Sequence, residues 1–165
     1  MALTFFPVSE LSHLDDQGRP RMVDVGAKAV TERRARAECA VNLGEVLMAQ
    51  LQSEDFRTKK GSVIGTATLA GIMAAKQTSS LIPLCHPLPL DHCSVHIEPL
   101  GKDSLRIECE CATSSKTGVE MEALTGASVA ALTVYDMCKA VNPSIGITGL
   151  HLLEKRGGKS DFNAD

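Results

Sequence analysis

Apolar and polar residues alternate from Arg36 to Leu43, a pattern that predicts a half-buried strand. Two further alternating segments flank the turn Gly101-Lys102-Asp103 and predict a hairpin. The residues that share one face of this hairpin are Cys93, Val95 and Ile97 in the first arm and Leu105, Ile107, Cys109 and Cys111 in the second. A last strand is predicted from Ile145 to Glu154.

The segments between the strands have helical character. A short helix is predicted from Glu45 to Gln52, and a helix rich in small residues from Val63 to Ser80. A long helix is predicted to open at Thr117-Gly118 and to reach about Val141, where Asn142-Pro143 ends it. The loop that separates the second helix from the hairpin is enforced by Pro83, Pro87 and Pro89.

The predicted elements follow the order βαββαβ, which is the ferredoxin-like plan. We therefore expect an α+β fold with an antiparallel sheet and helices packed on one face. The polar residues 1–21 predict a flexible N-terminal arm, and residues 157–165 a mobile tail that contains Gly and Lys. Between them, residues 22–156 are expected to form a single α+β domain.

Composition narrows the classes of function. The chain has 165 residues, a size typical of one domain, and a net charge of −3, which argues against a generic nucleic-acid or membrane-surface binder. Aromatic residues make up only 3% of the chain, with no Trp, so stacking of nucleic-acid bases on aromatic rings is excluded as a main binding mode. The core must be packed with Ala, Val, Leu, Ile and Met.

Six cysteines raise the question of disulfides or metal. No pair has C-x-x-C spacing and no secretory signal precedes them, so we expect free thiols in a cytoplasmic protein. His92 and His96 project to the opposite face of their strand from Cys93, which argues against a shared metal, and we assign no residue to a metal. The apolar window from Val63 to Ala75 is too short to cross a membrane.

The long helix is apolar around most of its circumference, so we expect it to be buried on several sides, including a subunit interface. Its polar residues fall within an arc of about 140°. They are Glu122, Thr125, Ser128, Thr133, Asp136 and Lys139. This seam is either a solvated face with one weak Asp136–Lys139 ion pair or the wall of an enclosed cleft.

Helix length constrains such a cleft. Glu122 and Asp136 are separated by about 21 Å along a continuous helix, at 1.5 Å per residue. The two ends of one helix therefore cannot act on the same substrate atom. Either two sites exist, or the glutamates of one chain meet the Asp–Lys pair of another in a symmetric assembly. We predict the second arrangement, a composite site between subunits.

Other candidates lie outside this helix. His86, held between prolines, could transfer protons or simply bond to backbone, and the adjacent Cys85 is expected to have a packing role. Three small basic clusters are either solvated surface or contacts for a phosphate-rich small molecule. They comprise Arg33, Arg34 and Arg36; Lys59 and Lys60; and Lys155, Arg156 and Lys159. Ser115-Lys116-Thr117-Gly118 lacks the glycines of a P-loop.

Several spaced motifs resemble the molybdenum cofactor biosynthesis protein C family, the cyclic pyranopterin monophosphate synthases. The similarity covers about Met22 to Ser160. The matching motifs are Met22-Val23-Asp24-Val25, Lys60-Gly61, Leu81-Ile82-Pro83-Leu84-Cys85-His86-Pro87-Leu88, Lys116-Thr117-Gly118-Val119-Glu120-Met121-Glu122-Ala123-Leu124, Tyr135-Asp136-Met137-Cys138-Lys139-Ala140 and Gly157-Gly158-Lys159-Ser160.

The resemblance implies a lyase that converts 3′,8-cyclo-7,8-dihydroguanosine 5′-triphosphate into cyclic pyranopterin monophosphate and releases diphosphate. By the same resemblance, Asp136 is the principal catalytic residue and Lys139 its partner, with Lys60 and His86 also catalytic. The implied substrate-binding residues are Leu84, Cys85, His86, Glu120, Met121, Glu122, Arg33 and Lys159. The resemblance further implies a hexamer built as a trimer of dimers, with the site between subunits.

The residue types suit this chemistry. A lysine beside an aspartate in a water-poor site can have its pKa moved toward neutrality by desolvation, which the aspartate opposes. No resident cofactor is expected, although Mg²⁺ can accompany a triphosphate without leaving a motif. Two positions depart from the family pattern: Ser62 stands where we expect Asp, and Gly126 replaces Ala at a cost to the helix of about 1 kcal/mol.

Two other classes of function remain open on the residues alone. A non-catalytic, oligomeric ferredoxin-like module that binds a metabolite would not need ionisable groups on a mostly buried helix. A nucleic-acid binder would show an affinity that falls steeply with salt.

Overall fold

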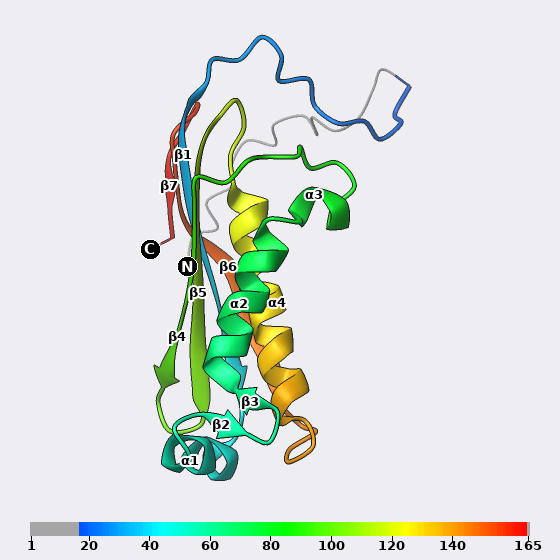
Figure 1. Ribbon diagram of the computed structural model, residues 1–165. Helices are drawn as coiled ribbons and strands as arrows, with labels where there is room; N and C mark the ends of the chain where they lie inside the picture. Colours follow the sequence, from blue (N-terminus) through cyan, green and yellow to red (C-terminus); the bar gives the residue numbers. More distant parts are fainter. Residues whose placement is uncertain (1–16, 165) are drawn as a thin grey trace, which may run out of the picture.

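Five antiparallel strands form one sheet in the order β4-β5-β1-β6-β7 (Figure 1). The computed structural model describes residues 17–164, and residues 1–16 of the predicted arm lie outside that part. The strands are β1 (Thr31–Asn42), β4 (His92–Leu100), β5 (Ser104–Ser115), β6 (Gly146–Arg156) and β7 (Phe162–Asn163). The first four strands in this order give the ferredoxin-like arrangement that the element order predicted.

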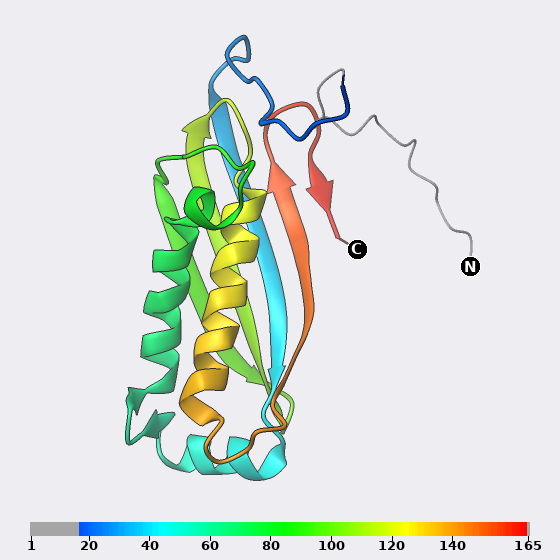
Figure 2. The same ribbon diagram turned by 90° about the vertical axis from the view of Figure 1, so that its right-hand side faces the viewer.

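The helices pack against one face of this sheet, as expected. α2 (Val63–Ala75) and α4 (Glu120–Cys138) lie side by side along the strands, while α1 (Glu45–Ser53) lies across one end of the sheet (Figures 1 and 2). A short turn of helix, α3 (Thr78–Leu81), follows α2, and a small ribbon of β2 (Arg57–Thr58) and β3 (Gly61–Ser62) precedes it. None of the helices in residues 17–164 meets the length and hydropathy needed to cross a membrane.

Side-chain alternation on β1 and β5 separates the core from the open face. The alternating Ala35, Ala37, Cys39 and Val41 of β1 are buried against the helices. The buried hydrophobic residues of the described chain include no aromatic, so the core consists of small and aliphatic side chains, as the composition predicted, with cysteine as an addition.

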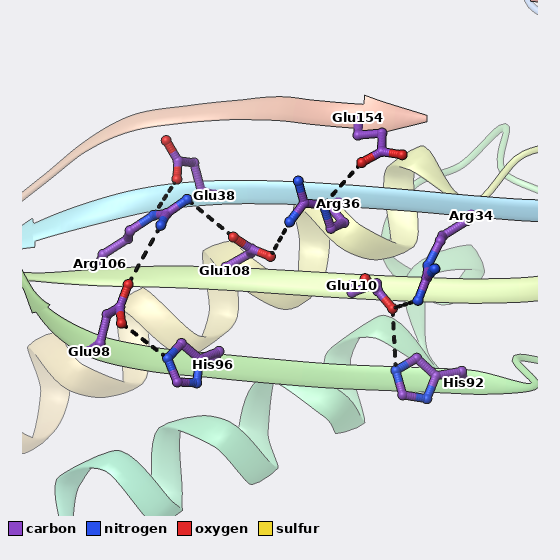
Figure 3. A network of polar contacts seen from close by, with 10 residues as sticks. All are labelled: Arg34, Arg36, Glu38, His92, His96, Glu98, Arg106, Glu108, Glu110 and Glu154. Atoms are coloured by element: carbon purple, nitrogen blue, oxygen red, sulfur yellow. Dashed lines mark hydrogen bonds and ion pairs between the residues drawn. The ribbon is translucent and has the colours of Figure 1, made fainter. Parts of the chain in front are cut away.

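The open face of the sheet carries a charged network instead of an apolar surface (Figure 3). Arg106 bonds to Glu38 at 2.6 Å and to Glu108 at 3.2 Å, and Glu108 also accepts from Arg36 at 3.0 Å. His92 and His96 lie on this face, opposite Cys93, as strand alternation predicted. These charged side chains make the outer face of the sheet polar. The apolar face of the sheet is the one that packs against the helices.

Several helix boundaries differ from the predictions. The helix predicted from Val63 to Ser80 stops at Ala75, because the hydroxyl of Thr78 donates to the Ala75 carbonyl at 2.9 Å and takes the place of a helical N–H. The long helix begins at Glu120 and ends at Cys138 instead of Val141. Beyond Cys138 the chain tightens, because the Val141 N–H donates to the carbonyl of Cys138, three residues earlier, at 2.9 Å.

The ends of the sheet also extend beyond the predicted strands. β1 begins at Thr31, five residues before the alternation that indicated it, and β6 runs to Arg156. In the segment predicted as a mobile tail, Phe162 and Asn163 pair with Lys155 and Glu154 as strand β7. Residues 157–160 therefore form the turn that brings the C-terminal segment back along β6.

Candidate active site

A cluster of two lysines and one aspartate lies at the C-terminal end of α4. Lys139 Nζ is 2.7 Å from one carboxylate oxygen of Asp136, and Lys60 Nζ is 3.1 Å from the other. Lys60 also donates to the backbone carbonyl of Asp136 at 2.8 Å. The turn between β2 and β3 carries Lys60 to this point, and Thr58 accepts the Lys60 backbone N–H at 3.1 Å. The ribbon thus positions a lysine from 76 residues earlier in the chain.

The charges in this cluster stabilise one another. Hydrogen bonds from Lys139 and Lys60 hold the pKa of the Asp136 carboxyl below its ordinary value, and the same contact with Asp136 raises the pKa of Lys139. A lower pKa for this lysine was predicted only for a water-poor site, with the aspartate opposing the shift, and the single chain leaves the pair exposed to water. Both side chains are more than half exposed, so attraction to the carboxylate prevails over desolvation.

A cavity of about 470 Å³ lies at the opposite, N-terminal end of α4. It gathers the candidates from the proline-rich loop and from the first turn of the helix. Its lining includes Leu84, Cys85, His86, Glu120, Met121 and Glu122. The N-terminus of a helix carries a partial positive charge, so carboxylates in its first turn are favourably placed.

His86 both lines this cavity and bonds to backbone. Its Nε2 lies 2.8 Å from the carbonyl oxygen of Val23, which can only accept, so Nε2 carries the proton. Val23 and Val25 belong to the segment before β1, and they line the cavity as well. A backbone bond and a role in proton transfer are therefore compatible for His86. The bond through one ring nitrogen fixes the orientation of the ring at the cavity wall.

Burial changes the acid–base properties of two groups here. Glu122 is only 4% exposed, and desolvation, reinforced by the charge of Glu120, raises the pKa of its carboxyl. Burial, with Glu122 nearby, also raises the pKa of the Cys85 thiol. A thiol that stays protonated suits packing better than nucleophilic attack, in line with the expectation for Cys85.

Glu120 is held differently from Glu122. Lys155 Nζ on β6 is 3.4 Å from its carboxylate. Gly118 makes this geometry possible, because a Cβ at that position would collide with the Glu120 carboxylate. The Thr117-Gly118 pair thus allows the side chain of Glu120 to fold back over the start of the helix.

A second cavity of about 340 Å³ adjoins the first and shares Thr117, Gly118 and Lys28 with it. Four cationic side chains line it: Lys28, Arg33, Lys116 and Lys159. Gly158 has φ +88°, and a Cβ there would collide with the guanidinium of Arg33. The Gly157-Gly158 turn therefore lets the C-terminal segment rest on Arg33 and brings Lys159 to the same cavity.

Strand alternation distinguishes Arg33 from its neighbours. Arg33 shares the helix-facing side of β1 with Ala35, whereas Arg34 and Arg36 point to the open face and pair with Glu110 and Glu108. Of the three arginines, Arg33 is the one that lines the cationic cavity in the described chain.

The sequence-predicted residues thus fall into two groups at opposite ends of α4. Lys60, Asp136 and Lys139 lie together at one end. The remaining candidates line the two adjoining cavities at the other end. Glu122 and Asp136 are separated by about 21 Å along the helix, so a single chain does not bring the two groups together. The polar seam between them bonds within the helix, where Ser128 and Thr133 donate to Leu124 and Val129.

The sequence reasoning gave two cavity lysines, Lys28 and Lys116, no role in the site, because both lie outside the three basic clusters. Lys155, a member of the third cluster, lies in β6 and lines the first cavity. Lys116 Nζ donates to the Gly26 carbonyl at 2.6 Å and ties the segment before β1 to the start of α4.

The amino-acid sequence was compared with those of known proteins. Residues 22–158 match the MoaC family. A protein of Xanthomonas oryzae pv. oryzae named cyclic pyranopterin monophosphate synthase is 53% identical over 156 residues, which is 94% of this chain and 94% of that protein. A Mycobacterium tuberculosis protein named cyclic pyranopterin monophosphate synthase 3 is 55% identical over 150 residues, 91% of this chain and 84% of that protein.

Proposed function

The chain belongs to the MoaC family, and from this premise we propose that it catalyses the synthesis of cyclic pyranopterin monophosphate, the reaction for which its relatives are named. The substrate is 3′,8-cyclo-7,8-dihydroguanosine 5′-triphosphate, diphosphate is released, and the product serves molybdenum cofactor biosynthesis. One observation carries the proposal: the ionisable candidates gather at the two ends of one helix, as an acid–base cluster and as a carboxylate cavity beside a cationic cavity.

The rearrangement of the ring system requires several proton transfers. Asp136 and Lys139, with Lys60 on the other carboxylate oxygen, form a coupled group that can give and take protons. Enclosure of this cluster by a second subunit would desolvate the lysines and lower their pKa toward the range where they act as acids and bases. His86 and Glu122 are further proton-handling groups on the other side of the substrate.

The cyclic phosphate forms when a substrate hydroxyl attacks the α-phosphorus. The new P–O bond replaces the bond to the β-phosphate, diphosphate leaves, and the hydroxyl proton passes to a base. Arg33 and Lys159 would bind the phosphate oxygens and stabilise the charge that develops on the leaving group, and Lys60 would assist from the other subunit. Leu84, Cys85, Glu120 and Met121 would then hold the ring system in the adjoining cavity.

We propose that the site is completed by a second copy of the chain, within a hexamer built as a trimer of dimers. The separation of the two groups along α4 requires a partner to unite them. The helix layer also leaves large apolar side chains exposed, which a subunit contact would cover. These are Leu69 and Met73 on α2 and Met121 and Leu132 on α4.

No resident cofactor enters the proposal. Mg²⁺ would arrive with the triphosphate as part of the substrate, and an assay with and without a chelator measures its contribution.

The reaction is tested by incubating the purified protein anaerobically with the cyclised dihydro-GTP and measuring diphosphate and the pterin product together. We expect both, in equal amounts, and a large loss of turnover in Lys60→Ala. The matched control is Lys59→Ala, which removes an equally exposed neighbouring lysine and should retain activity. Well-folded protein that binds the substrate but releases no diphosphate would instead indicate a non-catalytic metabolite-binding module.

A further inference from the structure

Three thiols gather between the sheet and the helices, outside the lining of both cavities. Cys93 on β4 stands directly opposite Cys111 on β5, and Cys109 precedes Cys111 on the same face. The Sγ atoms of Cys111 and Cys93 are 3.7 Å apart, and those of Cys109 and Cys111 are 3.9 Å apart. All three sulfur atoms lie within 4.8 Å of one another. Strand register, not sequence spacing, creates this triangle.

The triangle has the dimensions of a three-coordinate metal site. A point equidistant from three sulfur atoms with these separations lies about 2.2–2.5 Å from each of them. Thiolate–metal bonds to ions such as Zn²⁺ are about 2.3 Å long. An ion could therefore sit between the three sulfur atoms with little movement of the strands.

The surroundings are mostly apolar but open on one side. Cys109 and Cys111 are fully buried, whereas Cys93 is half-buried and offers a path from solvent. Gly126 of α4 leaves the space that Cys109 fills, because a Cβ at that position would lie 2.5 Å from the Cys109 sulfur. The exposed Lys76, which directly follows α2, favours the charged form of Cys93 and would offset part of the negative charge of the thiolates.

We propose that Cys93, Cys109 and Cys111 bind one soft monovalent ion, Cu(I), as a trigonal thiolate site. Among the described residues the group contains no fourth His, Cys, Asp or Glu, and structural Zn²⁺ almost always requires four ligands. Thiolates in apolar surroundings select soft ions such as Cu(I), which accepts three-coordinate geometry. Binding exchanges three thiol protons for the ion, forms three Cu–S bonds and involves no change of oxidation state.

The test titrates the reduced, full-length protein with Cu(I) held by a competing chelator, under anaerobic conditions. We expect one tightly bound ion per chain, a sulfur-to-copper charge-transfer band in the near ultraviolet, and three sulfur neighbours at about 2.3 Å by X-ray absorption. Cys93→Ser, at the half-buried position, should lose tight binding, because a serine hydroxyl is a poor ligand for a soft ion. Cys85→Ser removes another partly exposed thiol and should leave the affinity unchanged.

Thermal unfolding gives a second readout that does not depend on activity. An ion bound to the folded state raises Tm, and that rise should vanish in Cys93→Ser and in Cys109→Ser, each checked for folding by circular dichroism. Failure of the protein to compete with the chelator, two sulfur neighbours instead of three, or binding that survives Cys93→Ser would overturn the proposal. Tight binding of Zn²⁺ with a fourth ligand and no affinity for Cu(I) would overturn it as well.

Discussion

At the scale of single residues, Asp136 is the proposed catalytic residue, and its side chain lies at the surface of the single chain. Its carboxylate is bonded by two lysines, yet it contributes little to stability because all three side chains are exposed and screened by water. Asp136→Asn should therefore keep the fold, with little change in the free energy of unfolding. Turnover should fall by orders of magnitude, because an amide cannot accept the proton or hold both lysines.

Steady-state diphosphate release and urea unfolding of the same preparations check this prediction. Asp55→Asn is the matched control, since it makes the same chemical change at an exposed aspartate that forms no ion pair with Lys60 or Lys139, and it should leave both quantities unchanged. Normal turnover in Asp136→Asn would remove this residue from the chemistry.

Glu122, unlike Asp136, is a buried carboxylate, and it forms no ion pair among the described residues. Desolvation raises the pKa of its carboxyl in the folded state above its ordinary value of 4.5. The unfolded chain therefore releases this proton first, and the free energy of unfolding should decrease as pH rises from about 4.5 through the folded-state pKa. Glu122→Gln should lack this decrease and be more stable than the wild type at neutral pH.

The measurement is urea unfolding at a series of pH values, with the exposed Glu45→Gln as control. The control should keep the pH dependence of the wild type. A Glu122→Gln variant whose stability follows the same pH curve as the wild type would show that this carboxyl is not desolvated in the native protein.

Gly126 stands where the resemblance leads us to expect Ala, and the packing beneath it offers a reason for a glycine. A Cβ would lie 2.5 Å from the Cys109 sulfur, so the glycine and the cysteine are complementary. Gly126→Ala should lower the free energy of unfolding by about 1 kcal/mol net, because overpacking costs about 1–3 kcal/mol and helix propensity returns about 1.

A double-mutant cycle with Cys109→Ala checks this explanation by urea unfolding. Once the sulfur is removed, Gly126→Ala should become neutral or stabilising. Stabilisation by Gly126→Ala in the presence of Cys109 would contradict the packing argument.

At the scale of elements, the predictions from periodicity were most reliable where one face of an element is buried. The alternation of Ala37, Cys39 and Val41 predicted β1 correctly, and the hairpin of β4 and β5 has the turn that Gly101-Lys102-Asp103 indicated. Boundaries set by side-chain hydrogen bonds were missed. The Thr78 hydroxyl that ends α2 leaves no periodic signal in the sequence.

Ser62, the second position where the resemblance leads us to expect another residue, is the N-cap of α2. Its hydroxyl caps α2 by accepting the Gly65 backbone N–H at 3.1 Å, a role that aspartate fills equally well. Ser62→Ala should lower the free energy of unfolding by about 1 kcal/mol, and Ser62→Asp should remain within a few tenths of the wild type. Chemical denaturation measures both, and equal losses in the two variants would show that the cap is not what stabilises this end of the helix.

At the scale of the whole molecule, the sequence predicted the ferredoxin-like sheet and the separation of the candidate residues along α4. Helix length alone required two distant groups, and the structure places them at opposite ends. What the sequence could not reveal depends on register and turns. Cys93 meets Cys111 only because of the hairpin register, and Lys159 reaches the cavity of Arg33 only through the Gly157-Gly158 turn.

The central claim is that one active site takes Asp136 from one subunit and Glu122 from another. Its most direct test is subunit mixing. The variants Asp136→Asn and Glu122→Gln, each expected to be inactive alone, are unfolded together, reassembled and assayed for diphosphate release. Each mixed dimer would contain one site with both changes and one intact site, so about a quarter of the wild-type activity should return on random pairing. Co-assembled variants with no recovered activity would contradict the account, because both residues would then have to act within one chain.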